Sequence, residues 1–341
     1  MRMKSLHLIG LMALAVAGLH GQSTGPVYWS TTQPDCSSLN NESAVPIKDN
    51  SGATIGYSCY VSGTFVWLAA GGEWGTSIRV AAPAAGAVGV DYFFYDTNGN
   101  DLSLDTTGVF TGSSNAVSFA LYANQPTEIA LRGATSDAPS YGSTATGSVY
   151  AVFYCPDAAT CNDVLPQLIY SALPTYPWSL SVPIAWDAAV WTQWSAQGID
   201  DGRAHRVSLV IYNEDKTATS YTVKVYNSAG TLVGSGKTPL IPPLKDLGNG
   251  TLGEGGTYGA LLSDVISKPL PSGIFKVLVD GGSSYSAVEM LQINGLSATT
   301  LQVAYDSAPI SVARAAAAGR PNAGRMRVES MPRPVINALP N

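Results

Sequence analysis

Charged side chains are scarce in this chain of 341 residues: Asp, Glu, Lys and Arg make up 12% of it, and there are three histidines. Only His205 lies beyond residue 21, so a histidine-based metal site lacks its ligands. Asp200 and Asp201 precede His205 and could complete a Ser-His-Asp set. From residue 22 onward, however, the chain has no Gly-x-Ser-x-Gly elbow. The sequence favours His205 as a polar residue at a strand edge, and it predicts no metal and no cofactor.

Long apolar runs are also missing, except near the N-terminus. Leu6–Leu19 is apolar apart from His7, follows Arg2 and Lys4, and ends shortly before Gly21. A run of this length is shorter than the roughly 20 residues that a spanning helix needs. We therefore expect a signal peptide over residues 1–21 and a secreted or cell-surface protein, extracellular or periplasmic, with no transmembrane segment after its removal.

Amphipathic helix patterns rich in Leu, Glu and Lys are absent as well. The chain is instead rich in Gly, Ser, Thr, Tyr and Val, residues typical of pleated strands and tight turns. Short runs with period-two alternation, such as 117–122, recur along it with turn residues between them. This composition predicts an all-β fold.

Positive charge is scarce in the body of the protein. Residues 22–307 hold 11 Lys and Arg against 23 Asp and Glu, a net charge of −12. This balance argues against nucleic acid as a partner, because phosphate binding needs Lys and Arg. Residues 308–341 instead hold five Arg and one Glu without core-forming periodicity, which predicts a disordered, solvated tail.

Four cysteines are present, and an even number in a secreted chain favours disulfides. Three pairings are possible, and the sequence favours Cys36 with Cys59 and Cys155 with Cys161. Pro156 and Asp157 form a turn between the last two that could bring them together. A metal site is the weaker alternative, since neither CxxC spacing nor histidine partners are present.

A long internal repeat is the most informative pattern that is present. The strand and turn ending at Tyr95–Asn100 return 131 residues later at Tyr226–Thr231, and the strand 147–153 returns 126 residues later at 273–279. A repeat of this length corresponds to a whole domain. We therefore expect a disulfide-pinned, irregular N-terminal extension over 22–60 and two related β domains over 61–177 and 178–307.

The repeat also carries a resemblance. The segment 206–213, the turn 226–231 and the segments 261–264 and 270–273 resemble repeats of uncharacterised secreted bacterial proteins with tandem immunoglobulin-like β-sandwiches. The resemblance covers roughly 205–303 well and 76–171 more loosely, because the Asn-like end of the first strand is replaced by Ala82-Pro83. It implies an extracellular location and a binding or architectural role, and it brings no catalytic residues.

Aromatic side chains near the expected domain junction are the main candidate binding residues. Flat aromatic faces can stack on sugar rings, and the alternative is that the same rings pack between the domains. Trp191 and Trp194 are three residues apart, which places them on opposite faces of one strand, so at least one is expected in the core. The candidates are Tyr176, Trp178, Trp186, Trp191 and Trp194, with Tyr170 nearby.

Carboxylates and turns offer weaker candidates. Glu73, Glu128, Glu254 and Glu289 could supply a glycosidase pair, although nothing selects two of them, and Glu289 alternates with apolar neighbours in a way that predicts exposure to solvent. The turn 96–101 resembles the start of a calcium loop but lacks its later ligands, so a hairpin turn is favoured.

These observations lead to three functional hypotheses. The leading one is a non-catalytic extracellular or cell-surface module of the adhesion or matrix type, whose partner is a glycan or another surface protein. The second is a carbohydrate-binding protein that uses the junction aromatics. A polysaccharide-acting hydrolase is the least favoured. The loop 239–256, rich in Pro and Gly, is long enough to be functional or mobile.

Overall fold

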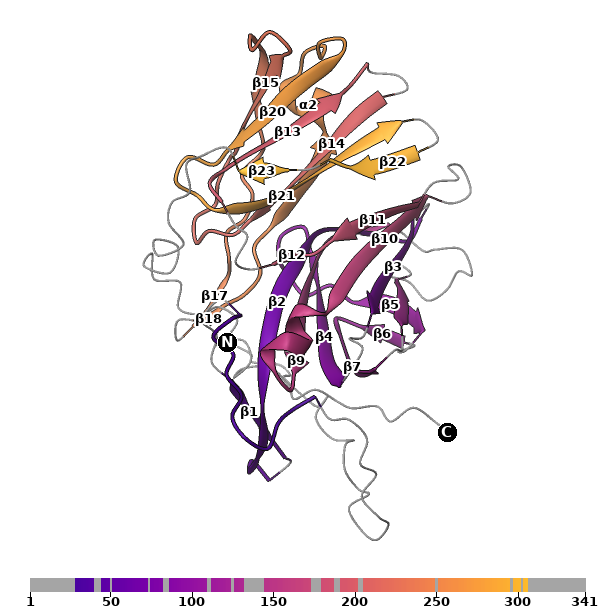
Figure 1. Ribbon diagram of the computed structural model, residues 1–341. Helices are drawn as coiled ribbons and strands as arrows, with labels where there is room; N and C mark the ends of the chain where they lie inside the picture. The colour runs from indigo at the N-terminus through magenta and orange to yellow at the C-terminus, as the bar shows by residue number, and fades with distance from the viewer. Residues whose placement is uncertain are drawn as a thin grey trace, which may run out of the picture.

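A computed structural model describes residues 28–39, 44–49, 51–72, 74–81, 86–108, 112–123, 126–131, 144–172, 179–186, 191–201, 205–248, 251–294, 297–301 and 303–305. The described chain is mostly antiparallel β structure, as the composition predicts. Its strands form four large sheets and one small hairpin, and the sheets are stacked in two pairs, one above the other in Figure 1. The predicted signal peptide and tail lie outside the described residues.

The first sheet pair contains sheets 1 and 2. Sheet 1 contains, in spatial order, β1 (Val45–Lys48), β2 (Thr54–Ala70), β9 (Ala145–Cys155), β4 (Ala87–Asp96) and β7 (Ala116–Tyr122), with β12 (Ala185–Trp186) also paired to β2. Sheet 2 contains β11 (Ser179–Pro183), β10 (Leu165–Ala172), β3 (Trp74–Ala81), β8 (Thr127–Leu131), β5 (Leu104–Gly108) and β6 (Gly112–Ser114). The short helix α1 (Ala158–Asn162) follows β9, and the Asp157 carboxylate caps it by accepting from the Thr160 amide at 2.8 Å.

The second sheet pair contains sheets 3 and 4. Sheet 3 contains β16 (Leu232–Lys237), β15 (Thr222–Asn227), β20 (Ile274–Asp280), β13 (Gln193–Ile199) and β23 (Ala304–Tyr305). Sheet 4 contains β19 (Thr257–Leu261), β14 (His205–Asn213), β21 (Ser286–Asn294) and β22 (Ser297–Thr300). The helix α2 (Leu262–Ile266) follows β19, and the small hairpin joins β17 (Asp246–Gly248) to β18 (Thr251–Leu252).

Alternation along the strands builds one core within each pair. On β4, Val88, Val90 and Tyr92 face inward, and on β14, Val207 and Leu209 do the same. Each core is lined from both of its sheets, which makes each pair sandwich-like. A strand with one inward face buries every second residue, and this is why the period-two pattern is visible in the sequence.

The boundary between the pairs differs from the expected one. The predicted second domain begins at residue 178, yet β11 pairs with β10 and β12 pairs with β2, both in the first pair. The first sheet pair therefore extends to Trp186. Three prolines in 172–186 obscure these strands in the sequence, because proline cannot donate to a sheet ladder and normally argues against a strand.

The N-terminal segment is more ordered than predicted. Its β1 strand adds to the edge of β2, and the Tyr28 and Trp29 rings cover the outer face of sheet 1. Ser58 donates to the Tyr28 carbonyl at 2.7 Å, which fixes this segment at the sheet. The described part of residues 22–60 is therefore only partly irregular, because the outer face of sheet 1 is apolar and aromatic and needs this cover.

Both disulfides have the expected pairing. Cys36 is bonded to Cys59 and Cys155 to Cys161. The first bond ties the N-terminal segment to β2, and the second ties β9 to α1. Two disulfides indicate an oxidising compartment, extracellular or periplasmic.

The two repeated turns have the same hydrogen bonds. The Asp96 carboxylate accepts from the Asn98 and Asn100 amides, and the Asn227 side-chain oxygen accepts from the Ala229 and Thr231 amides. In each turn a glycine takes positive φ, 72° at position 99 and 76° at position 230. After the turns the copies differ: the chain crosses to sheet 2 in the first, whereas it pairs directly with β15 as β16 in the second.

A β-bulge joins the two sheet pairs. The register of β2 shifts between Phe65 and Leu68, which turns Val66 toward β14 and β21. The bulge frees two carbonyls, and both are satisfied: Thr257 donates to the Val66 carbonyl at 2.7 Å, and the Tyr170 hydroxyl donates to the Trp67 carbonyl. The outer face of sheet 4 is therefore buried against the first pair.

Candidate functional site

The described members of the predicted aromatic site, Trp186, Trp191 and Trp194, do not share one surface. Trp194 is 8% exposed, lies in the core of the second pair and donates from its indole nitrogen to the Ser286 carbonyl at 3.1 Å. Trp191 is half-buried and packs against the same core. Tyr176 and Trp178 lie outside the described residues. Trp191 and Trp194 therefore contribute packing rather than an open stacking surface.

Trp186 and Tyr170 belong to the first sheet pair. Trp186 is half-buried and meets Phe153 edge to face, with ring centroids 6.0 Å apart. Tyr170 is buried and bonds to the β2 bulge. The junction aromatics are thus divided between two cores, because the chain crosses from one pair to the other between Trp186 and Trp191.

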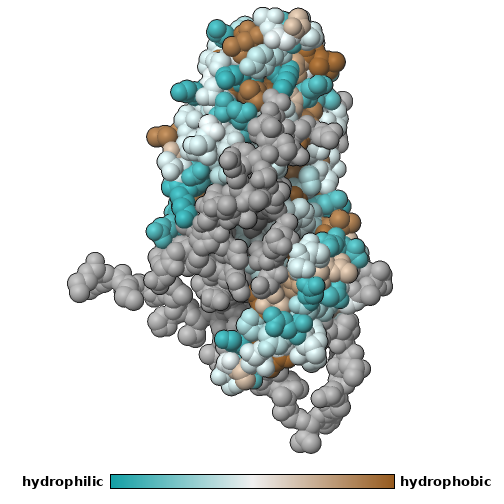
Figure 2. Space-filling model, turned by 60° about the vertical axis from the view of Figure 1, so that its left-hand side comes forward, coloured by the Kyte–Doolittle hydropathy of each residue, from teal (hydrophilic) through white to brown (hydrophobic). Residues whose placement is uncertain are grey.

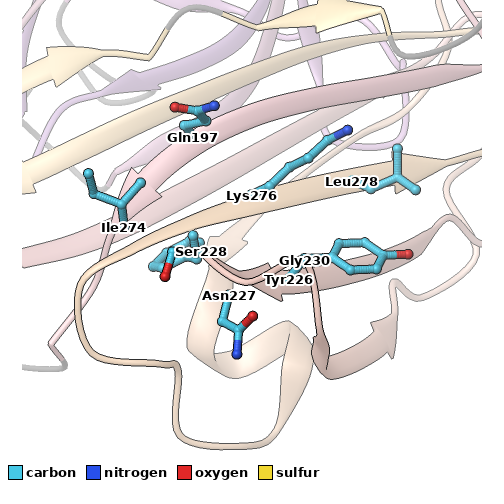
Figure 3. Close-up of a pocket in the computed structure, with 9 residues that line it drawn as sticks. Gln197, Tyr226, Asn227, Ser228, Gly230, Ile274, Lys276 and Leu278 are labelled. Atoms are coloured by element: carbon cyan, nitrogen blue, oxygen red, sulfur yellow. The ribbon is translucent and has the colours of Figure 1, made fainter.

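A solvent-facing hollow lies instead on the outer face of sheet 3. It has a volume of about 550 Å³ and opens beside the turn that joins β15 to β16. Figure 3 shows its side chains coming from three neighbouring strands, β13, β20 and β15. The hollow is lined by Gln197, Tyr226, Asn227, Ser228, Gly230, Ile274, Phe275, Lys276 and Leu278.

Strand register explains which side chains reach the hollow. Tyr226 on β15 is directly opposite Lys276 on β20, and Lys276 is directly opposite Gln197 on β13. Residues directly opposite each other share one face of an antiparallel sheet, so phenol, amine and amide lie in a row across three strands. Val225 and Val277, the chain neighbours of Tyr226 and Lys276, point to the opposite face and are buried in the core. The row is therefore held by strands that the core makes rigid.

Apolar side chains border this row. Ile199 and Ile274 are directly opposite each other and are 39% and 58% exposed. Leu278 is half-buried on the same face. Figure 2 shows hydrophobic residues in separate groups on the face that it presents. An exposed apolar pair beside polar donors suits a ligand that is itself amphipathic.

The turn beside the hollow is shaped by its own residues. The Asn227 oxygen accepts from the Thr231 amide at 2.9 Å, and Gly230 has the positive φ that this turn requires. The sequence identifies the turn as structural, but it does not identify the hollow. Alternation places Gln197, Tyr226 and Lys276 on the outer face, and only packing shows that this face is open.

Three of the candidate carboxylates lie in different places. Glu128 pairs with Arg79 at 3.1 Å on the surface, and neighbouring donors hold its pKa below the usual value. Glu254 is buried and accepts from the Tyr212 hydroxyl. Glu289 is also buried, which contradicts its predicted exposure, because the outer face of sheet 4 packs against the first pair. Burial raises the pKa of Glu289 to about 8. Glu73 lies outside the described residues.

The other candidate chemical groups have local partners. The His205 ring nitrogen lies 3.0 Å from the Asp201 carboxylate, while the buried Asp200 accepts from the Val207 amide at 3.0 Å. The Asp96 carboxylate also accepts from the Asn100 side chain, so this carboxylate is used within the turn 96–101, as in a hairpin turn. Across the described part of the chain, no group of three His, Cys, Asp or Glu side chains is placed to hold a metal ion.

Comparisons with protein-family models, with curated proteins and with solved structures gave no match. Within the residues that the structure describes, no helix is long and apolar enough to cross a membrane.

Proposed function

We propose that this protein is a non-catalytic extracellular or cell-surface binding module built from two tandem immunoglobulin-like sandwiches. The observation that carries the proposal is the hollow on the outer face of sheet 3, where Tyr226, Lys276 and Gln197 form a row beside exposed apolar side chains. Rigid strands hold these groups in place, which lowers the entropic cost of binding a ligand there.

Several features support this proposal. Both disulfides suit an oxidising compartment, and the buried bulge joins the two sheet pairs into a stiff unit. A stiff unit with an open sheet face is suited to presenting that face to a matrix or a cell surface. The row offers hydrogen-bond donors and acceptors together with apolar contact, and these are the two requirements for binding a saccharide.

The proposal is tested by binding of the purified protein to a panel of neutral and acidic polysaccharides. We expect saturable binding to at least one of them. Substitution Tyr226→Ala together with Gln197→Ala should weaken that binding at least tenfold, because both groups lie in the hollow. Gln193→Ala is the matched control, since Gln193 is on the same face but does not line the hollow.

Two further outcomes decide between the sites. Trp191→Ala probes the junction that the sequence favours, and loss of binding in that variant, with the hollow variants unaffected, would move the site to the junction. Absence of binding to every polysaccharide would overturn saccharide recognition at this face. Circular dichroism of each variant establishes that it remains folded.

A further inference from the structure

Lysines are concentrated on the outer face of sheet 3. Residues 22–307 hold seven lysines, and three of them, Lys224, Lys237 and Lys276, are on β15, β16 and β20. All three are exposed or half-buried. The body as a whole is strongly acidic, so this face differs in charge from the rest of the protein.

Strand register places the three lysines in a straight line. Lys276 is opposite Tyr226, and Lys224 lies two residues before Tyr226 on β15. Lys237 is opposite Thr222, which lies two residues before Lys224. Each lysine is therefore one strand and two residues away from the next. With strands about 4.8 Å apart and about 3.4 Å per residue, successive lysines are separated by roughly 8 Å.

This lysine diagonal, Lys276, Lys224 and Lys237, begins at the hollow and ends at the edge strand β16. We propose that the hollow and the lysine diagonal together bind a linear acidic polysaccharide whose sugars carry carboxylates, such as a polyuronate. This inference rests on the proposed function and specifies its ligand class.

The chemistry of the face matches such a chain. Carboxylates that recur along a linear polymer can meet cations that recur along a line. The Tyr226 ring and the Ile199–Ile274 pair offer apolar contact to the carbon-bearing faces of the sugar rings.

One acidic group lies beside the diagonal. Asp280 is 3.8 Å from the Lys224 amine, and both side chains are partly exposed to solvent. An ion pair between two solvent-exposed side chains is weak, so an incoming carboxylate can compete for Lys224.

The test measures binding of polygalacturonate and of neutral dextran to the full mature chain, at low and at high salt. We expect polygalacturonate to bind and dextran to bind at least tenfold more weakly. High salt should weaken polygalacturonate binding, because the cations are at the surface. The triple substitution Lys224→Gln, Lys237→Gln and Lys276→Gln should reduce the affinity at least tenfold.

The matched control is Lys216→Gln with Lys268→Gln, two exposed lysines outside the diagonal, and it should change the affinity less than twofold. Equal weakening by the control would overturn the inference in favour of diffuse charge attraction.

Dextran binding that depends on Tyr226 but not on the lysines would overturn the inference and leave the proposed function standing. Binding of neither polysaccharide would overturn the inference, and absence of binding across the whole panel would overturn saccharide binding as well. Single-stranded DNA is measured beside the two polysaccharides, and stronger binding of DNA than of polygalacturonate would overturn the inference.

Discussion

At the residue scale, buried polar groups in the second pair differ in how well they are satisfied. Asn213 is buried, and its side-chain nitrogen donates to three backbone carbonyls while its oxygen accepts from the Tyr221 hydroxyl. The Glu289 Oε1 atom is buried, and the described residues provide it with no hydrogen-bond partner. An unsatisfied buried carboxyl favours its neutral form, so Glu289 links stability to pH.

We predict that the protein loses stability as pH rises from about 4.5 to about 8. In this range native Glu289 keeps its proton, because its pKa is raised to about 8, while an unfolded Glu with the ordinary value of 4.5 loses it. The native state therefore binds more protons, and the free energy of unfolding falls as pH rises. Between pH 6 and pH 8, the free energy of unfolding of Glu289→Gln should fall by on the order of 2 kcal/mol less than that of the unchanged protein. Urea unfolding at several pH values measures this.

Asp91 provides an internal comparison for that experiment. Burial raises its pKa from 3.8 to about 6, although Ser118 and Tyr154 oppose the rise. The stability that Asp91 contributes therefore falls as pH rises from 3.8 to about 6, and this pH dependence should persist in the Glu289→Gln variant. Unchanged pH dependence above pH 6 in that variant would show that Glu289 is not the group responsible.

At the element scale, the two disulfides hold in place segments that strand pairing alone does not hold. The Cys36–Cys59 bond closes a separation of 23 residues and holds the segment over sheet 1, whereas Cys155–Cys161 closes a separation of six beside α1. All four cysteines are at most 3% exposed, so their removal creates similar packing defects. The difference between the two bonds then depends mainly on loop length.

We predict that Cys36→Ala with Cys59→Ala costs about 3 kcal/mol, and Cys155→Ala with Cys161→Ala about 2 kcal/mol, from loop closure. The longer loop gains more entropy in the unfolded chain when its bond is removed. Urea unfolding of both double variants at one pH measures the two costs. An equal or reversed order would show that local packing, and not loop closure, sets their contributions.

At the scale of the whole molecule, the two sheet pairs share a buried interface. Val66, Val210 and Tyr212 are each at most 3% exposed and pack together across it. Lys245 donates to the Asn100 side chain at 2.5 Å, and the Thr257 amide donates to the Thr97 carbonyl at 3.0 Å. Lys245 lies in the long loop 239–256, expected to be functional or mobile, and links its described part to the first repeated turn.

We predict that Val66→Asp uncouples the two sheet pairs. The substitution buries an unpaired charge in the interface, which should cost on the order of 3 kcal/mol and separate unfolding into two transitions. Differential scanning calorimetry measures the number of transitions. Ile55→Asp, on the same strand but 42% exposed, is the control and should leave the unfolding profile nearly unchanged. A single transition in Val66→Asp would indicate that the pairs are coupled elsewhere.

The sequence by itself determined the features that depend on near neighbours along the chain. Period-two alternation specified β structure, and the Asp96 and Asn227 turns were recognisable because their hydrogen bonds lie within five residues. The favoured cysteine pairing was also correct. Each of these features follows from local backbone geometry or from short loop closure, and both can be derived from residue types and spacing.

Only the tertiary structure decided which outer faces are covered. Alternation assigns Glu289 and Lys276 alike to the outward face of a strand, yet Glu289 is buried against the first pair while Lys276 borders an open hollow. The difference arises because sheet 4, and not sheet 3, packs against the β2 bulge. Such packing joins residues more than a hundred positions apart, and period-two alternation is the same whether the outward face meets water or another sheet.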